Sequence, residues 1–344
     1  MESLQITLQS KDYSYKVHFG GEFSIENYRK ILVVSNPKVF ALHGAKLLSR
    51  LKAESVFVVT IKDGEKYKNL ESIKEILDNA FIYKLDRKSL IIGFGGGVIT
   101  DMAGFAAGIF ERGIDFINIP TTLLSQVDAS VGGKTGVNSD FGKNLIGLFY
   151  QPKAVFLDSE FLSTLPKKEL ISGISEIIKM AVCFDGEFFS WLENADLLHN
   201  QADLKEAIFR SVAIKARIVM QDERENGIRA GLNYGHTFGH IIELLGNYTQ
   251  FLHGEAVSLG IIKANALAVK LNKLSQQDCN RINALLAKNS LPTQYIVSDK
   301  EAFYAHFYLD KKSQNSILRF VVPNGIGQME IVENPPKDII LSIL

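Results

Sequence analysis

Three of the seven histidines lie close together, between positions 236 and 253. His236 and His240 are four residues apart in the segment NYGHTFGH, so on a helix they share one face. His253 follows in the segment HGE. The pattern is not the HExxH of zinc peptidases, because Thr237 stands at the Glu position. A single histidine would be read as structural, but three clustered among glycines favour a metal site.

A third ligand could come from the segment Ile174-Ser-Glu-Ile-Ile-Lys179. Glu176 lies there inside an apolar helical stretch, and a buried carboxylate is costly unless it meets a metal or a cation. Two imidazoles and one carboxylate, with a coordination position left open, are typical of a Lewis-acid site. Cys183 falls on the same helical face as Glu176, but the residue is better read as a buried structural thiol.

Two loops are suited to a nucleotide. In SLIIGFGGGVITD (residues 89–101) an apolar run leads into glycines and then into a helix, where backbone amides and the helix N-terminus can hold a pyrophosphate. The run is not the GxGxxG fingerprint, since Val98 occupies the last glycine position, and no P-loop lysine follows. The loop DGEKYK (residues 63–68) follows another apolar run and is a second candidate.

A third segment is rich in hydroxyls, glycines and lysines. It reads PTTLLSQVDASVGGKTGVN (residues 120–138) and is followed by GKN (residues 142–144). Lys134 and Lys143 have no carboxylate beside them in sequence to neutralise their charge. Hydroxyl and ammonium groups suit a polyhydroxylated, negatively charged ligand.

The elements that must position these residues fall into two parts. Nearly continuous apolar runs predict buried parallel strands at 31–35, 56–61, 90–93, 116–119 and 154–157. Helical patterns such as 69–83 alternate with them, which predicts a doubly wound, Rossmann-like α/β domain over residues 1–164. Residues 165–344 are predicted to be mostly helical, with helices at 167–183, 186–196, 203–222, 236–246, 254–272 and 276–288 and one strand pair at 317–322 and 328–332.

Bulk composition excludes several classes. The chain has 344 residues, which favours two domains, and its 38 basic and 38 acidic residues cancel, so no overall field attracts nucleic acid or an anionic membrane. Its two cysteines, Cys183 and Cys279, form no disulfide framework. No secretory signal and no apolar stretch of about 18 residues is visible. We therefore expect a cytoplasmic protein.

Ten motifs in order make the chain similar to one family, the 3-dehydroquinate synthases of the sugar-phosphate cyclase superfamily. The resemblance runs from about Ile31 to Lys312 and rests on DGEKYK, GGGVITD, FERG, NIPTTLLSQVDASVGGKTGVN, GKNLIG, FLSTLP, SEIIK, LNYGHTFGH, HGEAV and LDKK. It implies an NAD- and metal-dependent carbon–oxygen lyase that converts 3-deoxy-D-arabino-heptulosonate 7-phosphate into 3-dehydroquinate and phosphate. That step belongs to the shikimate pathway, which leads to chorismate and the aromatic amino acids. The resemblance also implies a homodimer.

The same resemblance implies roles for individual residues. The metal, Zn²⁺ or Co²⁺, would be held by Glu176, His236 and His253, which leaves His240 as a catalytic or phosphate-contacting residue. NAD contacts would come from Asp63, Gly64, Glu65, Lys66, Tyr67, Lys68, Gly97, Val98, Ile99, Thr100, Asp101, Thr121, Thr122, Lys134, Lys143, Phe161, Leu162, Ser163 and Thr164. Substrate contacts and catalytic groups would be Arg112, Asp128, Lys134, Asn144, Lys179, Lys215, Arg229, Asn233, His240, Lys311 and Lys312.

The chain departs from the family pattern at two positions. Thr100 stands where the family commonly has Gly, and Ser175 where it often has Ala. Three other interpretations are open: a related cyclase that makes a valiolone or scyllo-inosose type of product, a metal-dependent polyol dehydrogenase, and a non-catalytic NAD-binding protein. The lysines of GGKTG and LDKK and Arg229, suited to an anionic substrate, favour the synthase.

Overall fold

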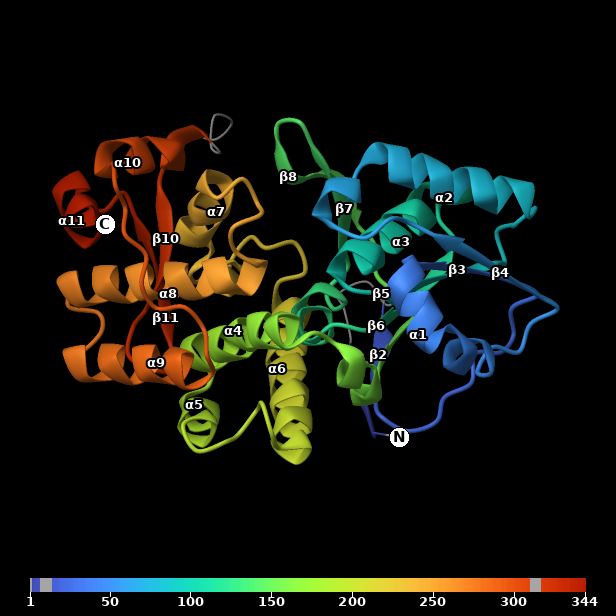
Figure 1. Ribbon diagram of the computed structural model, residues 1–344, viewed down its shortest axis with the longest axis horizontal. Coiled ribbons are helices and arrows are strands. Elements are labelled where there is room, and N and C mark those ends of the chain that lie inside the picture. The colour runs from blue at the N-terminus through green and yellow to red at the C-terminus, as the bar shows by residue number, and fades with distance from the viewer. Residues whose placement is uncertain (1, 7–13, 310–316) are drawn as a thin grey trace. The chain divides into compact units, whose positions relative to one another are not determined.

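The computed structural model describes residues 2–6, 14–309 and 317–344 (Figure 1). Lys311 and Lys312 therefore lie outside the described residues. The chain forms two compact units: the first comprises residues 1–166 and 215–224, and the second comprises residues 167–214 and 225–344. The return of 215–224 to the first unit was not foreseen from the sequence.

A seven-stranded sheet forms the centre of the first unit, in the order β1-β2-β9-β6-β5-β3-β4. Only β1 runs antiparallel to its neighbour. The strands are β1 (Glu2–Ile6), β2 (Tyr15–Phe19), β3 (Lys30–Ser35), β4 (Ser55–Thr60), β5 (Leu90–Gly95), β6 (Asp115–Pro120) and β9 (Ala154–Leu157). The five strands predicted from apolar runs are confirmed as β3, β4, β5, β6 and β9, whereas β1 and β2 were missed.

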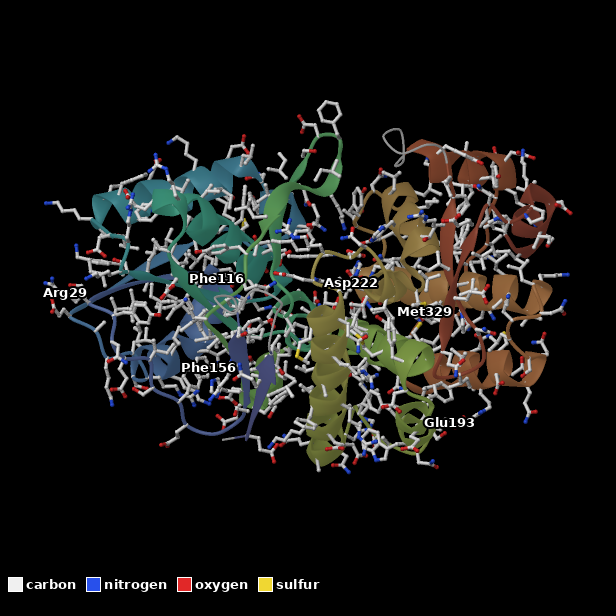
Figure 2. All side chains as sticks on the ribbon, turned by 180° about the vertical axis from the view of Figure 1, so that it is seen from behind. Arg29, Phe116, Phe156, Glu193, Asp222 and Met329 are labelled. Atoms are coloured by element: carbon white, nitrogen blue, oxygen red, sulfur yellow. The ribbon has the colours of Figure 1, made fainter. Side chains whose placement is uncertain are left out.

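Helices cover both faces of this sheet, as the continuous apolar strands require. One apolar layer contains Phe116 of β6 and packs under α2 (Leu70–Ile82) and α3 (Gly97–Ile109). The other contains Phe156 of β9 and packs against α1 (Pro37–Leu48). Figure 2 labels both phenylalanines. The predicted helix at 69–83 is confirmed as α2, and the Asn69 side chain caps it by accepting from the amide of Ser72 at 2.9 Å.

Short segments complete the first unit. A separate antiparallel hairpin is formed by β7 (Lys134–Ser139) and β8 (Gly142–Phe149). The short helical turns are η2 (Glu65–Tyr67), η3 (Phe110–Arg112), η4 (Ser125–Ala129) and η5 (Ser159–Thr164). These segments carry most of the residues that the sequence linked to nucleotide or substrate.

The second unit is mostly helical, as predicted. Its elements are α4 (Lys167–Phe184), α5 (Gly186–Leu192), α6 (Gln201–Gln221, whose last residues belong to the first unit), η6 (Ile228–Asn233), α7 (His236–Leu245), α8 (His253–Lys270), α9 (Gln276–Lys288), α10 (Lys300–Leu309), α11 (Lys337–Ile343) and the hairpin of β10 (Arg319–Pro323) and β11 (Met329–Glu333). The expected fold class, a parallel-sheet α/β unit and a mainly helical one, is confirmed. In the part of the chain that the structure describes, no helix has both the length and the apolar character needed to span a membrane.

Glycines let the helices of this unit pack with their backbones in direct contact. A Cβ atom on Gly260 of α8 would overlap the carbonyl oxygen of Gly235, which precedes α7. A Cβ on Gly254, in the first turn of α8, would overlap the carbonyl oxygen of Ser172 in α4. Helix α8 therefore has direct backbone contact with both neighbouring helices.

We predict that Gly260→Ala lowers the stability of the second unit by at least about 2 kcal/mol, since the new methyl group meets backbone rather than a movable side chain. Gly44→Ala is a matched control, because the atoms nearest to its Cβ in α1 would belong to the side-chain ring of Phe40, the closest at 2.9 Å. Alanine also gains up to about 1 kcal/mol of helix propensity over glycine. Thermal unfolding of both variants measures the difference, and equal melting temperatures would contradict the close-packing account.

Candidate metal centre and ligand-binding loops

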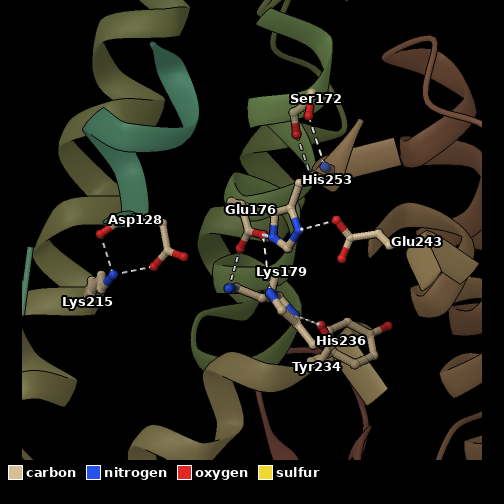
Figure 3. Close-up of polar contacts among 11 residues, drawn as sticks. Asp128, Ser172, Glu176, Lys179, Lys215, Tyr234, His236, Glu243 and His253 are labelled. Carbon is tan, nitrogen blue, oxygen red and sulfur yellow. Dashed lines mark hydrogen bonds and ion pairs between the residues drawn. The ribbon is translucent and has the colours of Figure 1, made fainter. Parts of the chain in front are cut away.

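Glu176, His236 and His253 converge in the second unit, one from each of α4, α7 and α8 (Figure 3). One potential ligand atom from each residue lies within 4.8 Å of the other two. The Nε2 atoms of both histidines lie 3.5 Å from the same carboxylate oxygen, Oε1 of Glu176. Two imidazole nitrogens and a carboxylate oxygen are thus close enough together to bind one metal ion.

The far side of each imidazole is held by a hydrogen-bond acceptor. Nδ1 of His236 lies 3.1 Å from the backbone carbonyl of Tyr234, and Nδ1 of His253 lies 3.3 Å from Oε1 of Glu243. Because both partners are acceptors, Nδ1 carries the proton in each ring. Metal-binding histidines commonly use their second nitrogen in this way, which leaves Nε2 for the ion.

The carboxylate at the centre of this cluster is fully buried and charge-balanced. The Glu176 side chain is 0% exposed and that of Lys179, one turn later in α4, is 1% exposed. The Lys179 ammonium forms an ion pair with Oε2 of Glu176, so the other oxygen is the one that faces the histidines. A buried carboxylate needs such partners.

The two histidines differ in protonation. Burial and the nearby Lys179 charge lower the pKa of His236 to about 3, so this ring is neutral at neutral pH. Burial also acts to lower the pKa of His253, but hydrogen bonds to Glu176 and Glu243 outweigh it and raise the pKa to about 9. A metal ion that binds here must displace the proton from Nε2 of His253.

The donor set fits a borderline-soft dication such as Zn²⁺ or Co²⁺, which accept imidazole nitrogen together with carboxylate oxygen.

His240 is not in the group of converging ligand atoms; its ring lies 5.4 Å from that of His236, and the residue is exposed. Cys183 is also outside this group, and burial raises the pKa of its thiol. The group of converging ligand atoms thus contains only one histidine, His236, of the i,i+4 pair.

Two further predicted residues of this unit lie on η6, immediately before α7. Arg229 is 2% exposed. Asn233 donates through Nδ2 to Oε1 of Glu225. Gly235, with φ of 80°, then turns the chain into α7 and positions His236.

In the first unit the glycine run forms the expected strand-to-helix turn. Gly96 is extended and α3 begins at Gly97, with no side chain capping its first amides. A Cβ on Gly95 would lie 2.8 Å from Ile99, and one on Gly96 would lie 3.0 Å from Thr122. The uncapped amides at the start of a 13-residue helix fit a pyrophosphate.

Thr100 is one of the two positions at which the chain departs from the family pattern, where glycine is common. Its side chain is buried, with Oγ1 3.1 Å from the carbonyl of Gly97 and 3.3 Å from the hydroxyl of Ser125. The hydroxyl is thus buried in the first unit, with hydrogen-bond partners, and the structure has room for threonine at this position.

The loop 63–68, the start of α3 and the β7–β8 hairpin are joined by a polar network. Lys68 pairs with Asp101 at 2.6 Å and donates to Asn144. Burial raises the pKa of Asp101, although the charge of Lys68 opposes this. Asn138 also donates to Glu65 at 2.8 Å. The hydrogen bonds and the ion pair involve four predicted nucleotide or substrate residues, Glu65, Lys68, Asp101 and Asn144.

The remaining predicted residues of this unit are spread over several segments. Lys215, from the end of α6, donates to the carboxylate of Asp128 in η4. Arg112 lies in η3 with φ of 67° and is exposed. In η5 the side chains of Phe161 and Leu162 are buried, whereas Ser163 and Thr164 are exposed. The other members lie at strand ends or in the hairpin: Thr121 and Thr122 after β6, Lys134 at the start of β7 and Lys143 in β8.

Sequence reasoning missed Glu243 and Tyr234, the two residues that hold the far sides of the imidazoles. Glu243 could have been noticed, because it follows His236 by seven residues and so lies on the same face of a helix. Tyr234 acts through its backbone carbonyl, which leaves no signal in the residue type.

Comparisons with known proteins identify a family for this chain. Residues 58–172 match the family model for the N-terminal part of 3-dehydroquinate synthase and residues 173–313 the model for its C-terminal part. A 3-dehydroquinate synthase of Nitratiruptor sp. is 54% identical over 97% of this chain and 95% of its own length.

Two solved structures are also similar. A 2-epi-5-epi-valiolone synthase of Streptomyces hygroscopicus with NAD⁺ and Zn²⁺ bound has a TM-score of 0.87 at 26% identity, covering 96% of this chain and 95% of that chain. A 2-deoxy-scyllo-inosose synthase complexed with carbaglucose-6-phosphate, NAD⁺ and Co²⁺ has a TM-score of 0.87 at 26% identity, covering 99% of both chains. The identity to the first relative and its coverage confirm the resemblance seen in the motifs: this chain belongs to the 3-dehydroquinate synthase family.

Proposed function

We propose that this chain is a 3-dehydroquinate synthase, which converts 3-deoxy-D-arabino-heptulosonate 7-phosphate into 3-dehydroquinate and phosphate in the shikimate pathway. The observation that carries the proposal is the convergence of Glu176, His236 and His253 within 4.8 Å, in a chain with relatives of that name at 54% and 56% identity. We propose a homodimer as its assembly, which sedimentation would test.

The proposed cofactors are NAD and a dication, Zn²⁺ or Co²⁺. The two solved cyclases that resemble the chain are described with NAD⁺ and one or the other of these metals. When bound, the dinucleotide would take up and return a hydride and the metal would polarise substrate oxygens. Glu176, His236 and His253 would hold the ion, and the uncapped start of α3 would hold the pyrophosphate.

The residues of the chain itself would bind and orient the substrate. A sugar phosphate that also carries a carboxylate needs several cations, and fixed orientation lets successive steps proceed on one molecule. Lys179 and Arg229 are buried cations of the second unit, while Lys215 is a buried cation of the first. The proposed NAD and substrate contacts are those implied by the family motifs, from Asp63–Lys68 and Gly97–Asp101 to Asn144, Asn233 and His240.

A related cyclase is the second candidate, since the two solved neighbours are a 2-epi-5-epi-valiolone synthase and a 2-deoxy-scyllo-inosose synthase. The relatives of 50–56% identity favour the dehydroquinate product. A polyol dehydrogenase differs in its stoichiometry, because it would consume NAD⁺ in proportion to product.

We predict that the purified protein, given the heptulosonate phosphate, metal and NAD⁺ in catalytic amount, releases phosphate and forms 3-dehydroquinate with many turnovers per NAD⁺. Product identification by mass spectrometry and a parallel assay with glucose 6-phosphate and sedoheptulose 7-phosphate distinguish the candidates. Phosphate release from only one of the latter two sugars would replace this proposal by the corresponding cyclase.

We predict that His253→Ala and His240→Ala have different effects on metal content. His253→Ala removes a ligand, so the bound metal and nearly all turnover should be lost. His240→Ala should keep its metal, because His240 lies outside the donor group, while turnover falls by about 10²-fold or more if the imidazole acts in proton transfer. Elemental analysis after dialysis gives the metal content, and full metal retention in His253→Ala would overturn the ligand assignment.

A further inference from the structure

Glu243 lies on the same face of α7 as His236, two turns further along the helix. It is 3% exposed and stands in an otherwise apolar run, Ile241-Ile-Glu-Leu-Leu245. A carboxylate in such a place is costly unless it has a specific partner. None of the ten family motifs includes Glu243.

One partner of Glu243 lies at the start of the neighbouring helix α8. Oε1 of Glu243 is 3.3 Å from Nδ1 of His253, and Nε2 of the same ring is 3.5 Å from Oε1 of Glu176 (Figure 3). The imidazole of His253 therefore lies between two buried carboxylates, one on each nitrogen. One of them is a proposed ligand, and the other lies on the side away from the donor group.

His236 and His253 differ in what holds the Nδ1 side of the ring. Nδ1 of His236 faces a neutral backbone carbonyl, that of Tyr234, which is fixed by the chain itself. His253 is the first residue of α8, its backbone is anchored through the amide of Gly254 to Ser172 Oγ at 2.9 Å, and its side chain is 30% exposed. Its ring therefore depends on a side-chain partner for orientation.

We propose that Glu243 is a positioning residue of the metal centre: it accepts the Nδ1 proton of His253, fixes the ring with Nε2 toward Glu176, and makes that nitrogen a stronger donor. This inference rests on the proposed metal site. Partners of this kind orient the ligand and raise its basicity, and their loss costs about 10–100-fold in metal affinity.

The test compares Glu243→Gln and Glu243→Leu with the wild-type protein. Gln keeps the size and an acceptor oxygen but removes the charge, whereas Leu removes both. We expect Zn²⁺ affinity, measured by competition with a chromophoric chelator, to fall in the order wild type, Gln, Leu, with a loss of about 10–100-fold for Leu. The visible spectrum of the Co²⁺-loaded protein should also change in the Leu variant, since it reports ligand geometry.

Glu255→Gln is the matched control. It removes the same charge two residues from His253, but Glu255 accepts from the backbone amide of Leu252 at 2.8 Å and not from an imidazole. Its Zn²⁺ affinity should equal that of the wild type. Thermal unfolding of the metal-free proteins shows which variants are folded, and if Leu is not, the comparison of Gln with the wild type decides.

The metal centre and the role of Glu243 can be disproved by different results. If the wild-type protein binds no Zn²⁺ at one ion per chain, the proposed metal centre itself is wrong. If it binds Zn²⁺ and the folded Glu243 variants bind with unchanged affinity and an unchanged Co²⁺ spectrum, the positioning role of Glu243 is overturned while the metal centre stands.

Discussion

The second unit is organised around one buried carboxylate. Glu176 has no exposed side-chain surface, and a charge in that position is tolerated only with close partners of complementary character. Lys179 on the same helix supplies one, and the imidazoles of His236 and His253 supply the others. Since these come from α4, α7 and α8, the three helices must meet at this point.

The glycines around the histidines belong to the same constraint. Gly235 and Gly260 bring the start of α7 against α8, and Gly254 brings the first turn of α8 against α4. Larger residues would separate the helices by the width of a methyl group or more and carry the ligand nitrogens away from Glu176. In the sequence these glycines indicate a site, and in the structure they act by permitting backbone contact.

The sequence predicted those features that depend on residue type and local period. Five parallel strands followed from apolar runs, and the metal cluster followed from histidines, glycines and a carboxylate in an apolar helix. Strand β2 (Tyr15–Phe19) alternates apolar and polar residues, so a search for continuous apolar runs missed it, and β1 is likewise no apolar run. The β7–β8 hairpin is rich in glycine and polar residues and has no strong period. The i,i+4 spacing of His236 and His240 is misleading, because the imidazole that meets Glu176 beside His236 comes from another helix, α8, and not from the same face of α7. The network of Lys68, Asp101 and Asn144 joins segments far apart in sequence and could not be predicted from local patterns.

Local charge explains how a chain with no net charge can be suited to an anionic substrate. Around the proposed metal position the structure places two carboxylates, Glu176 and Glu243, and one buried ammonium, Lys179. A dication added to this set leaves the centre positive, because Lys179 offsets one carboxylate and the metal outweighs the other. Burial strengthens the field of that remaining charge compared with the same groups in water. A bound metal would therefore stabilise a substrate oxygen that gains negative character, and among the surrounding groups the Lys179 ammonium would add to this effect by offsetting one carboxylate. The same reasoning accounts for a lysine beside a metal ligand, a combination that would be unfavourable if the task were only to bind the ion tightly.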